Sequence, residues 1–485
     1  MLPECISVAS GSFYATMLVF IDFMTFLRFH CLEMGAALTY LDDPVTKAHL
    51  DRFRFPSRAS GSAGSMQGWR RDMEDSHCYW YHEPSDTALF GVFDGHGGKG
   101  VSLWVARRLP QIIEANENFK KGEYARALHE SFMALDVEMH SDKSAAKLIR
   151  ELQETNDPDA PEQLISVDMQ TLLGIFGGAD SAIDGVLRIK ENVTPTNVLT
   201  LLRSSDPLHA IFEGPLLHRF THKSGDTYFI HAKHVFEALD REPSAESQGC
   251  TATVALVDFK NGRVYCANAG DSRAVLARDG KAAALSVDHK PTQQLERRRV
   301  LAAGGKIIGK GENARIEGDL NLSRSLGDLR YKQNKNIAPE LQIISARPDI
   351  RTRQLCKSDR FIVIACDGIW EKLTSQDCVT LLTDKLKKVD VSSAIEEMFQ
   401  SCICKSMDPE DGDCDFTGCD NMTLLVIELD PSYTSTLPET SEESLHASAP
   451  QTFGRPVPEL QVDSKKRKKG SSNVQAKKAR KDSSD

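Results

Sequence analysis

The stretch Phe90-Gly-Val-Phe-Asp94-Gly95-His96-Gly97-Gly98-Lys99 is the most informative part of this 485-residue chain. Its apolar first half has the composition of a buried strand, and a carboxylate follows directly where that strand ends. A glycine, a histidine and two more glycines come next, so backbone flexible enough to offer a carbonyl lies beside an acid–base group. The order predicts a metal ligand, Asp94, at a strand end next to a candidate proton donor, His96.

Acidic groups in similar settings recur far away in the chain. They lie in Arg70-Arg-Asp-Met-Glu74-Asp75, in Cys366-Asp367-Gly368 and in Gly418-Cys-Asp420-Asn421. Carboxylates, a backbone carbonyl and water are hard oxygen ligands that favour Mg²⁺ or Mn²⁺ over zinc. We therefore expect an all-oxygen metal site assembled from distant strands.

Such a site suggests phosphoryl chemistry. Two ions ~3.5–4 Å apart can share and acidify a bridging water and hold a phosphoryl group for in-line attack. No covalent nucleophile is needed, and the chain has neither a Cys-x5-Arg nor a Gly-x-Ser-x-Gly motif. An arginine such as Arg70 suits the phosphate, and a histidine such as His96 suits the leaving alkoxide as proton donor.

Each residue alone has a simpler interpretation. Asp-Gly pairs such as those at Asp94, Asp279 and Asp367 are common in turns. His96 could be a packed or surface histidine, and Arg70 beside Arg71 could be a solvated pair. The joint occurrence of these residues favours the functional interpretation.

Composition and charge place the chain among soluble globular proteins. Apolar residues make up 40% and charged residues 26%. The net charge of −10 hides an asymmetry, because residues 464–485 hold nine Lys/Arg and two Asp, which leaves the rest near −17. We expect no direct nucleic-acid binding by so acidic a core.

The twelve cysteines form no Cys-x-x-Cys pair, which in so long a chain indicates a reducing compartment. Four of them crowd together, but their spacing fits no common zinc pattern, so we expect no zinc there: Cys402, Cys404, Cys414 and Cys419.

The N-terminal segment is atypical. Residues 13–29 are strongly apolar, but Asp22 interrupts them and the run is shorter than the ~20 residues of a spanning helix. We interpret residues 1–33 as an atypical extension, with a weak membrane anchor as the less favoured alternative, and we expect no membrane association. If translation began at Met34, Gly35 would match an N-myristoylation signal.

The remaining pattern predicts an α+β fold. Strands joined by hairpins are expected at 251–258 and 263–268 around Lys260-Asn-Gly262, and at 273–277 before Arg278-Asp-Gly280. Further strands are expected at 361–366 and 422–429. Helices are expected at 100–109, 124–138, 234–239, 293–303, 376–387 and 392–404.

Eight motifs, taken in order, resemble the signature of the metal-dependent protein Ser/Thr phosphatases of type 2C, most closely its gamma-type member. They are Gln67–Arg70 with Met73–Asp75, Phe93–Gly98, Gly249–Thr253, Ala267–Arg273, Asp288–Pro291, Leu322–Asp328, Cys366–Trp370 and Gly418–Thr423. The resemblance implies a central antiparallel β-sandwich flanked by helix pairs, with a dimetal cleft at one end. It also implies hydrolysis of phosphoserine and phosphothreonine in proteins by a metal-activated bridging water.

The resemblance implies a role for each site residue. Asp94 would bridge two Mg²⁺ or Mn²⁺ ions, Glu74 and the Gly95 carbonyl would serve one ion, and Asp367 and Asp420 the other. Asp75 would hold metal-bound water, and Asp271 matches the position tied to a third, weaker ion. Arg70 would bind the phosphate, and His96 would protonate the leaving oxygen. A scaffold protein that keeps the fold and uses its insertion and tail to engage nuclear partners is the alternative.

The predicted organisation has six parts. They are residues 1–65, an extension and lead-in; 66–138, the first phosphatase part; 139–247, an insertion; 248–430, the second phosphatase part; 431–463, a disordered linker; and 464–485, a basic tail. Residues 140–247 are only mildly acidic, unlike the strongly acidic gamma-type insertion. The basic clusters 465–469 and 477–481 predict a bipartite nuclear import signal, an import receptor as partner and a nuclear location with a cytoplasmic pool.

Overall fold

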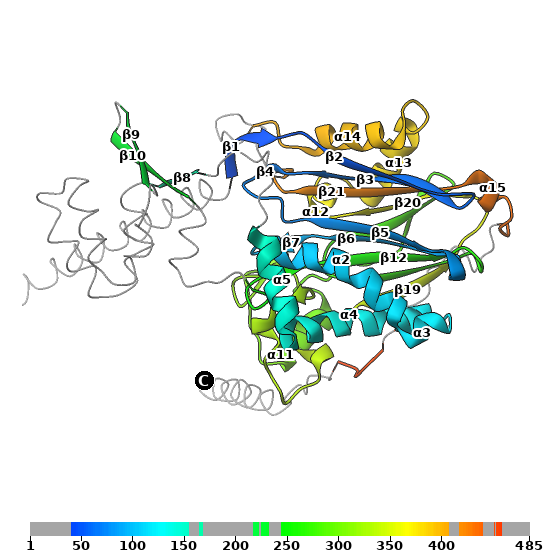
Figure 1. Cartoon of the computed structure of the whole chain (residues 1–485), viewed down its shortest axis with the longest axis horizontal. Helices are drawn as coiled ribbons and strands as arrows, with labels where there is room; N and C mark the ends of the chain where they lie inside the picture. Colours follow the sequence, from blue (N-terminus) through cyan, green and yellow to red (C-terminus); the bar gives the residue numbers. More distant parts are fainter. Residues whose placement is uncertain are drawn as a thin grey trace, which may run out of the picture.

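Two antiparallel β-sheets form the centre of the protein (Figure 1). The computed structural model describes residues 40–154, 164–167, 217–222, 225–231, 244–406, 417–439, 451 and 453–457. The six-stranded sheet has the order β15 (Lys281–Ala284), β14 (Arg273–Arg278), β20 (Asp359–Ala365), β21 (Met422–Leu429), β3 (Ala59–Met66) and β2 (His49–Phe55). The five-stranded sheet has the order β19 (Asp349–Gln354), β13 (Arg263–Ala269), β12 (Ala252–Asp258), β6 (Thr87–Phe93) and β5 (Ser76–His82).

The two sheets pack face to face. Phe90 and Val257 of the five-stranded sheet share one buried cluster with Leu276, Ile364 and Ile427 of the six-stranded sheet. This packing confirms the predicted sandwich. It also explains why β6 and β12 read as continuous apolar runs, because helices cover their other face.

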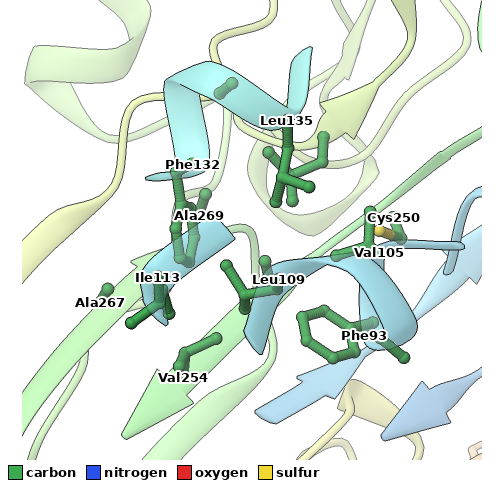
Figure 2. Close-up of a cluster of buried hydrophobic side chains, with 14 of the residues drawn as sticks. Phe93, Val105, Leu109, Ile113, Phe132, Leu135, Cys250, Val254, Ala267 and Ala269 are labelled. Carbon is green, nitrogen blue, oxygen red and sulfur yellow. The ribbon is translucent and has the colours of Figure 1, made fainter. Parts of the chain in front are cut away.

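Helices cover both outer faces. Those on the five-stranded sheet are α2 (Gly100–Ala115), α3 (Glu117–Lys120), α4 (Tyr124–Ser141) and α5 (Lys143–Glu154). Figure 2 shows how Val105, Leu109 and Ile113 of α2 and Phe132 and Leu135 of α4 meet the sheet. Those on the six-stranded sheet are α12 (Asp367–Trp370), α13 (Ser375–Lys385) and α14 (Val391–Cys402).

Smaller elements complete the described chain. The strands are β1 (Tyr40–Val45) paired with β4 (Gly68–Arg70); β7 (Gly95–His96), β11 (Gly249–Cys250) and β18 (Leu326–Gly327) in one sheet; β16 (Ile307–Ile308) paired with β17 (Arg315–Ile316); and β8 (Leu164–Val167), β9 (Leu217–His222) and β10 (Gly225–His231) in another. The remaining helices are α11 (Gln294–Ala302), α15 (Pro431–Thr434) and the 3₁₀ turns 83–85, 311–313, 329–331 and 339–341.

The predicted hairpins are confirmed. β12 pairs with β13 across the Asn-Gly turn, where Gly262 has φ 63°. β14 pairs with β15 across Asp279 and Gly280, and both residues have positive φ, as a type I′ turn requires. The expected helix at 234–239 lies outside the described residues, as do the apolar segment 13–29, Gly35, Cys414 and the basic tail.

The sheets and the helical layer include residues on both sides of the predicted part 66–138. β2 and β3 belong to the six-stranded sheet, although their residues fall largely within the predicted lead-in. At the other boundary, Ile149 and Leu152 of α5 are buried in the same cluster as α2, beyond residue 138. Residues 431–434 of the predicted disordered linker 431–463 form α15, and Tyr433 is buried, so the fold also continues past residue 430. The insertion, the rest of the linker and the tail stay predictions. None of the helices within the described ranges is long and apolar enough to cross a membrane.

Candidate functional site

The strand registers bring the predicted site residues to one end of the sandwich. Ser76 pairs with Phe93, so Glu74, just before β5, lies near Asp94, just after β6. Ala365 pairs with Leu424 and with Arg273, so Asp367 after β20, Asp420 before β21 and Asp271 before β14 share that end. Antiparallel pairing therefore brings together carboxylates from distant parts of the sequence, from Glu74 to Asp420.

These residues line a cleft of about 580 Å³. Its wall contains all but one of the predicted site residues: Arg70, Glu74, Asp94, Gly95, His96, Asp271, Asp367 and Asp420. The exception, Asp75, is 7% exposed and lies against the site, because ligand atoms of Asp75, Asp94 and Cys366 all fall within 4.8 Å of one another. The structure thus brings the predicted residues together, while their individual roles stay predictions.

Burial and mutual repulsion raise the proton affinity of the carboxylates. Burial, followed by the charge of Asp367, raises the pKa of Asp94 well above its usual value. Burial and the charge of Asp271 do the same to the pKa of Asp367. Burial raises the pKa of Glu74 and that of Asp75 to about 7 each. Such a cluster needs protons or bound cations to compensate its negative charge.

Position 95 requires a glycine because the backbone at Glu74 packs directly against it. A Cβ at this position would lie 2.1 Å from the carbonyl oxygen of Glu74. The Ser102 hydroxyl donates to that same carbonyl from the start of α2. The contact brings the segment carrying Glu74 and Asp75 next to Asp94.

Asn421 ties the loops of the site together and was missed as a site residue by the sequence analysis. Its side-chain oxygen accepts from the Glu74 amide at 2.9 Å. Its side-chain nitrogen donates to the carbonyls of Gln67 and Asp72 at 2.8 and 2.9 Å. The only sequence signal was its place beside Asp420 in a quoted motif, because an amide's partners cannot be read from its neighbours in the chain.

Arg70 lies at the wall of the cleft. Its Nη2 donates to Asp420 Oδ2 at 2.7 Å, and its guanidinium lies 5.6 Å from the centre of the Tyr40 ring. Burial acts against the charge of Arg70, but Asp420 and the hydrogen bond from Arg70 outweigh it and raise the pKa of Arg70. A permanent planar cation at this place suits an incoming phosphate.

His96 is paired with a buried carboxylate that we quoted in a motif without giving it a role. His96 Nε2 lies 2.7 Å from Asp328 Oδ2, and Asp328 is fully buried. Burial lowers the pKa of His96, but the charge of Asp328 and the hydrogen bond outweigh burial, so the pKa of His96 is raised. The pairing with Asp328 therefore favours the protonated form of the ring.

Asp271 is paired with Lys290, another residue to which the sequence analysis gave no role. Asp271 is 2% exposed and accepts from the Lys290 ammonium. Burial lowers the pKa of Lys290, but the charge of Asp271 outweighs this and raises it. Lys290 comes from the Asp-His-Lys-Pro motif that follows β15.

The donor set fits hard divalent cations. Within the described ranges, no Lys or Arg forms an ion pair with Asp94 or Asp367, and the Asp75 Oδ2 atom lacks a hydrogen-bond partner. The donors are oxygens, apart from the buried Cys366 thiol, whose pKa burial raises well above its usual value. Oxygen-rich sites of this kind hold Mg²⁺ or Mn²⁺.

The predicted cysteine cluster is part of the core where it is described. Cys402, Cys404 and Cys419 are buried, and Cys404 and Cys419 pack with Trp69.

Comparison with known proteins gives one matching family and several similar chains. The family described as protein phosphatase 2C matches residues 59–154 and 213–408. The chain is 33% identical to "Probable protein phosphatase 2C 21" of Arabidopsis thaliana over 83% of this chain and 96% of that one. It is 29% identical to "Protein phosphatase 1G" of Homo sapiens over 79% and 90% of the two chains. A solved phosphatase structure from Toxoplasma gondii aligns with a TM-score of 0.47 at 20% identity, over 83% of this chain and 98% of that one.

Proposed function

The chain belongs to the protein phosphatase 2C family of metal-dependent protein serine/threonine phosphatases, and we propose that it uses a pair of Mg²⁺ or Mn²⁺ ions to hydrolyse phosphoserine and phosphothreonine. The observation that carries the proposal is the convergence of Asp94, Asp367 and Asp420 at one cleft with Glu74 and Gly95. The substrates that we propose are phosphorylated proteins.

Different residues would hold the two ions. Asp94 would bridge them, Glu74 and the Gly95 carbonyl would hold one, and Asp367 and Asp420 the other. The raised pKa values of Asp94 and Asp367 support cation binding at this cluster, because buried like charges are stabilised by bound cations. When bound, the ions supply an acidified water as the nucleophile and neutralise phosphate charge. A third, weaker ion at Asp271 would have to share this carboxylate with Lys290.

The remaining residues bind phosphate and move the proton. Arg70 would orient the phosphate through its guanidinium, which is fixed on one side by Asp420. Water would add to phosphorus as the bond to the serine or threonine oxygen breaks. His96 would give its ring proton to that oxygen and regain a proton from solvent, so that the products are free hydroxyl and inorganic phosphate.

Phosphate release from a phosphothreonine peptide tests this function. The full-length protein is assayed with about 10 mM Mn²⁺ or Mg²⁺, roughly tenfold above the ~10⁻³ M dissociation constants of weak hard-cation sites, and again with excess EDTA. We expect turnover in both metals and its loss on chelation. A well-folded protein that releases no phosphate with either metal would overturn the proposal.

We also propose that part of the protein is located in the nucleus. The two basic clusters of the tail support an import receptor as partner and a nuclear pool beside a cytoplasmic one. The acidic core gives no reason to expect nucleic-acid binding.

A further inference from the structure

His96 and Asp328 meet across a glycine in a three-stranded sheet at the cleft. In this sheet β11 lies between β7 and β18, so Gly249 pairs with His96 on one side and with Gly327 on the other. The His96–Asp328 contact passes over Gly249, because a Cβ at position 249 would lie 2.3 Å from Asp328 Oδ2 and 2.7 Å from His96 Nε2. Because Gly249 has no side chain, His96 and Asp328 have room to contact each other.

The backbone at Asp328 is bent to aim its carboxylate at the ring. Gly327 and Asp328 have φ values of 77° and 49°, a left-handed pair that aspartate tolerates better than most residues. The Asp328 amide donates to the Gln248 carbonyl at 2.8 Å, which fixes this bend against β11. The Ser325 hydroxyl donates to the same Asp328 oxygen that contacts His96.

A second buried ion pair holds the other side of this strand. Asp136 of α4 accepts from the Gly327 amide at 2.9 Å. Lys332 donates both to Asp136 and, at 2.8 Å, to the Ser325 carbonyl. Its side chain and that of Asp136 are 8% and 12% exposed. The support of Asp328 therefore reaches into the helical layer.

We propose that Asp328 is the positioning residue of the proton donor, fixing the His96 ring across Gly249 so that its other nitrogen faces the departing oxygen. Nε2 is engaged by Asp328, which leaves Nδ1 for the substrate. Asp328 keeps its charge throughout and touches neither phosphate nor metal in this scheme. The inference rests on the proposed function, because it assigns a partner to the residue that would protonate the leaving group.

A positioning role predicts a loss that depends on the leaving group. A serine or threonine oxygen needs a proton as it departs, whereas the nitrophenolate of 4-nitrophenyl phosphate departs without one. General acids typically contribute ~10²–10⁴-fold to rate. Asp328→Asn, which keeps the volume and tolerates the left-handed backbone, should lower kcat on a phosphothreonine peptide about 10²-fold or more. Its effect on 4-nitrophenyl phosphate should be far smaller, and KM should stay unchanged.

Two further variants test the geometry. Gly249→Ala, which inserts a methyl group between the two side chains, should give the same substrate-selective loss without altering either partner. The double variant His96→Gln with Asp328→Asn should be no slower on the peptide than His96→Gln alone, since residues acting as a unit are not additive.

The matched control is Asp359→Asn. Asp359 is also a fully buried acid, paired with Arg278 at 2.6 Å, and it does not line the cleft. It should lower the unfolding temperature while keeping the wild-type ratio of peptide to aryl phosphate rates.

The outcomes are distinguishable. Equal losses on both substrates, or no loss on the peptide, in folded Asp328→Asn would overturn the positioning role while wild-type activity stands. If the wild-type protein does not hydrolyse the peptide in Mn²⁺, the proposed function itself fails.

Discussion

At the scale of single residues, the cleft depends on glycines as much as on charged groups. Gly95 lets the Glu74 carbonyl approach, and Gly249 leaves room for the His96–Asp328 contact. The function of both glycines is therefore to allow close approach of other groups. The presence of both glycines is visible in the sequence, but the atom that each one admits comes from a distant segment.

Replacement of Gly95 by alanine should damage the site directly. The new methyl carbon would lie 2.1 Å from backbone, which cannot move aside as a flexible side chain could. Overpacking of this kind costs about 1–3 kcal/mol. We expect a lower free energy of unfolding in urea and a loss of metal-dependent phosphate release.

Gly280→Ala serves as the control for this substitution. Gly280 lies in a turn with φ 71° and has no heavy atom within 4 Å of an added Cβ. Left-handed backbone costs an alanine about 1–2 kcal/mol, so stability should fall here too while turnover is retained. Wild-type turnover in folded Gly95→Ala would contradict the close-contact argument.

At the scale of elements, a buried ion network joins α11 to the sheets. Glu296 of α11 accepts from Arg324, just before β18, at 2.6 Å and from Arg299 at 2.9 Å. Arg324 also donates to Asp349 of β19 at 2.7 Å. Because the participating side chains of Glu296, Arg299 and Arg324 are at most 3% exposed, each charge depends on its partners.

Glu296→Gln should be strongly destabilising at neutral pH. Removing one member of a buried charge network typically costs about 3–5 kcal/mol, because the remaining charges lose compensation. Urea unfolding of the variant and wild type at pH 7 measures this difference. Glu397→Gln, which removes an exposed pair with Lys385, should cost less than about 1 kcal/mol.

The lowered pKa of Glu296 predicts how the stability difference between wild type and Glu296→Gln depends on pH. Burial raises the pKa of Glu296, but Arg324 and Arg299 outweigh it and hold the pKa well below its usual 4.5. A lowered folded-state pKa stabilises the protein above pH 4.5, and this stabilisation is lost as the pH falls below that value. The difference in the free energy of unfolding between wild type and Glu296→Gln should therefore narrow by up to about 1.4 kcal/mol per pH unit below pH 4.5. A gap that stays constant down to pH 3 would contradict the account.

Local signals predicted the elements well, and non-local contacts explain what was missed. The hairpin at Gly262 depends on two neighbouring residues, so the sequence reveals it. The inclusion of α5 in the core depends on Ile149 packing against a helix that begins at Gly100. The support given by Asp328 and Asn421 likewise depends on contacts across long stretches of chain, which no local pattern contains.

At the scale of the whole molecule, the acidic core and the basic tail differ sharply in charge. Residues 464–485, which hold nine Lys/Arg and two Asp, lie outside the described residues. A segment nearer the core does contact the fold. The Gln451 amide donates to the Ile350 carbonyl of the edge strand β19 at 2.7 Å, and Phe453 packs against the buried cluster that contains residues of α2, α4 and α5. This contact fixes the chain about a dozen residues before the first basic cluster.

Neutralising the first basic cluster should keep the protein out of the nucleus. Alanine at each of residues 465–469 should shift a fluorescently tagged full-length protein to the cytosol, as judged by imaging. Arginine at the same positions preserves the charge and should leave the protein nuclear. An alanine variant that remains nuclear would refute the import signal.

The central claim is that the cleft carboxylates form a two-ion site, and calorimetric titration of Mn²⁺ into the full-length protein tests it most directly. The wild-type protein should bind two ions, with any third ion weaker. Asp94→Asn, which removes the proposed bridge, should lose this pair of sites while Asp359→Asn retains it. Equal numbers of ions bound with equal affinity by wild type and Asp94→Asn would contradict the account.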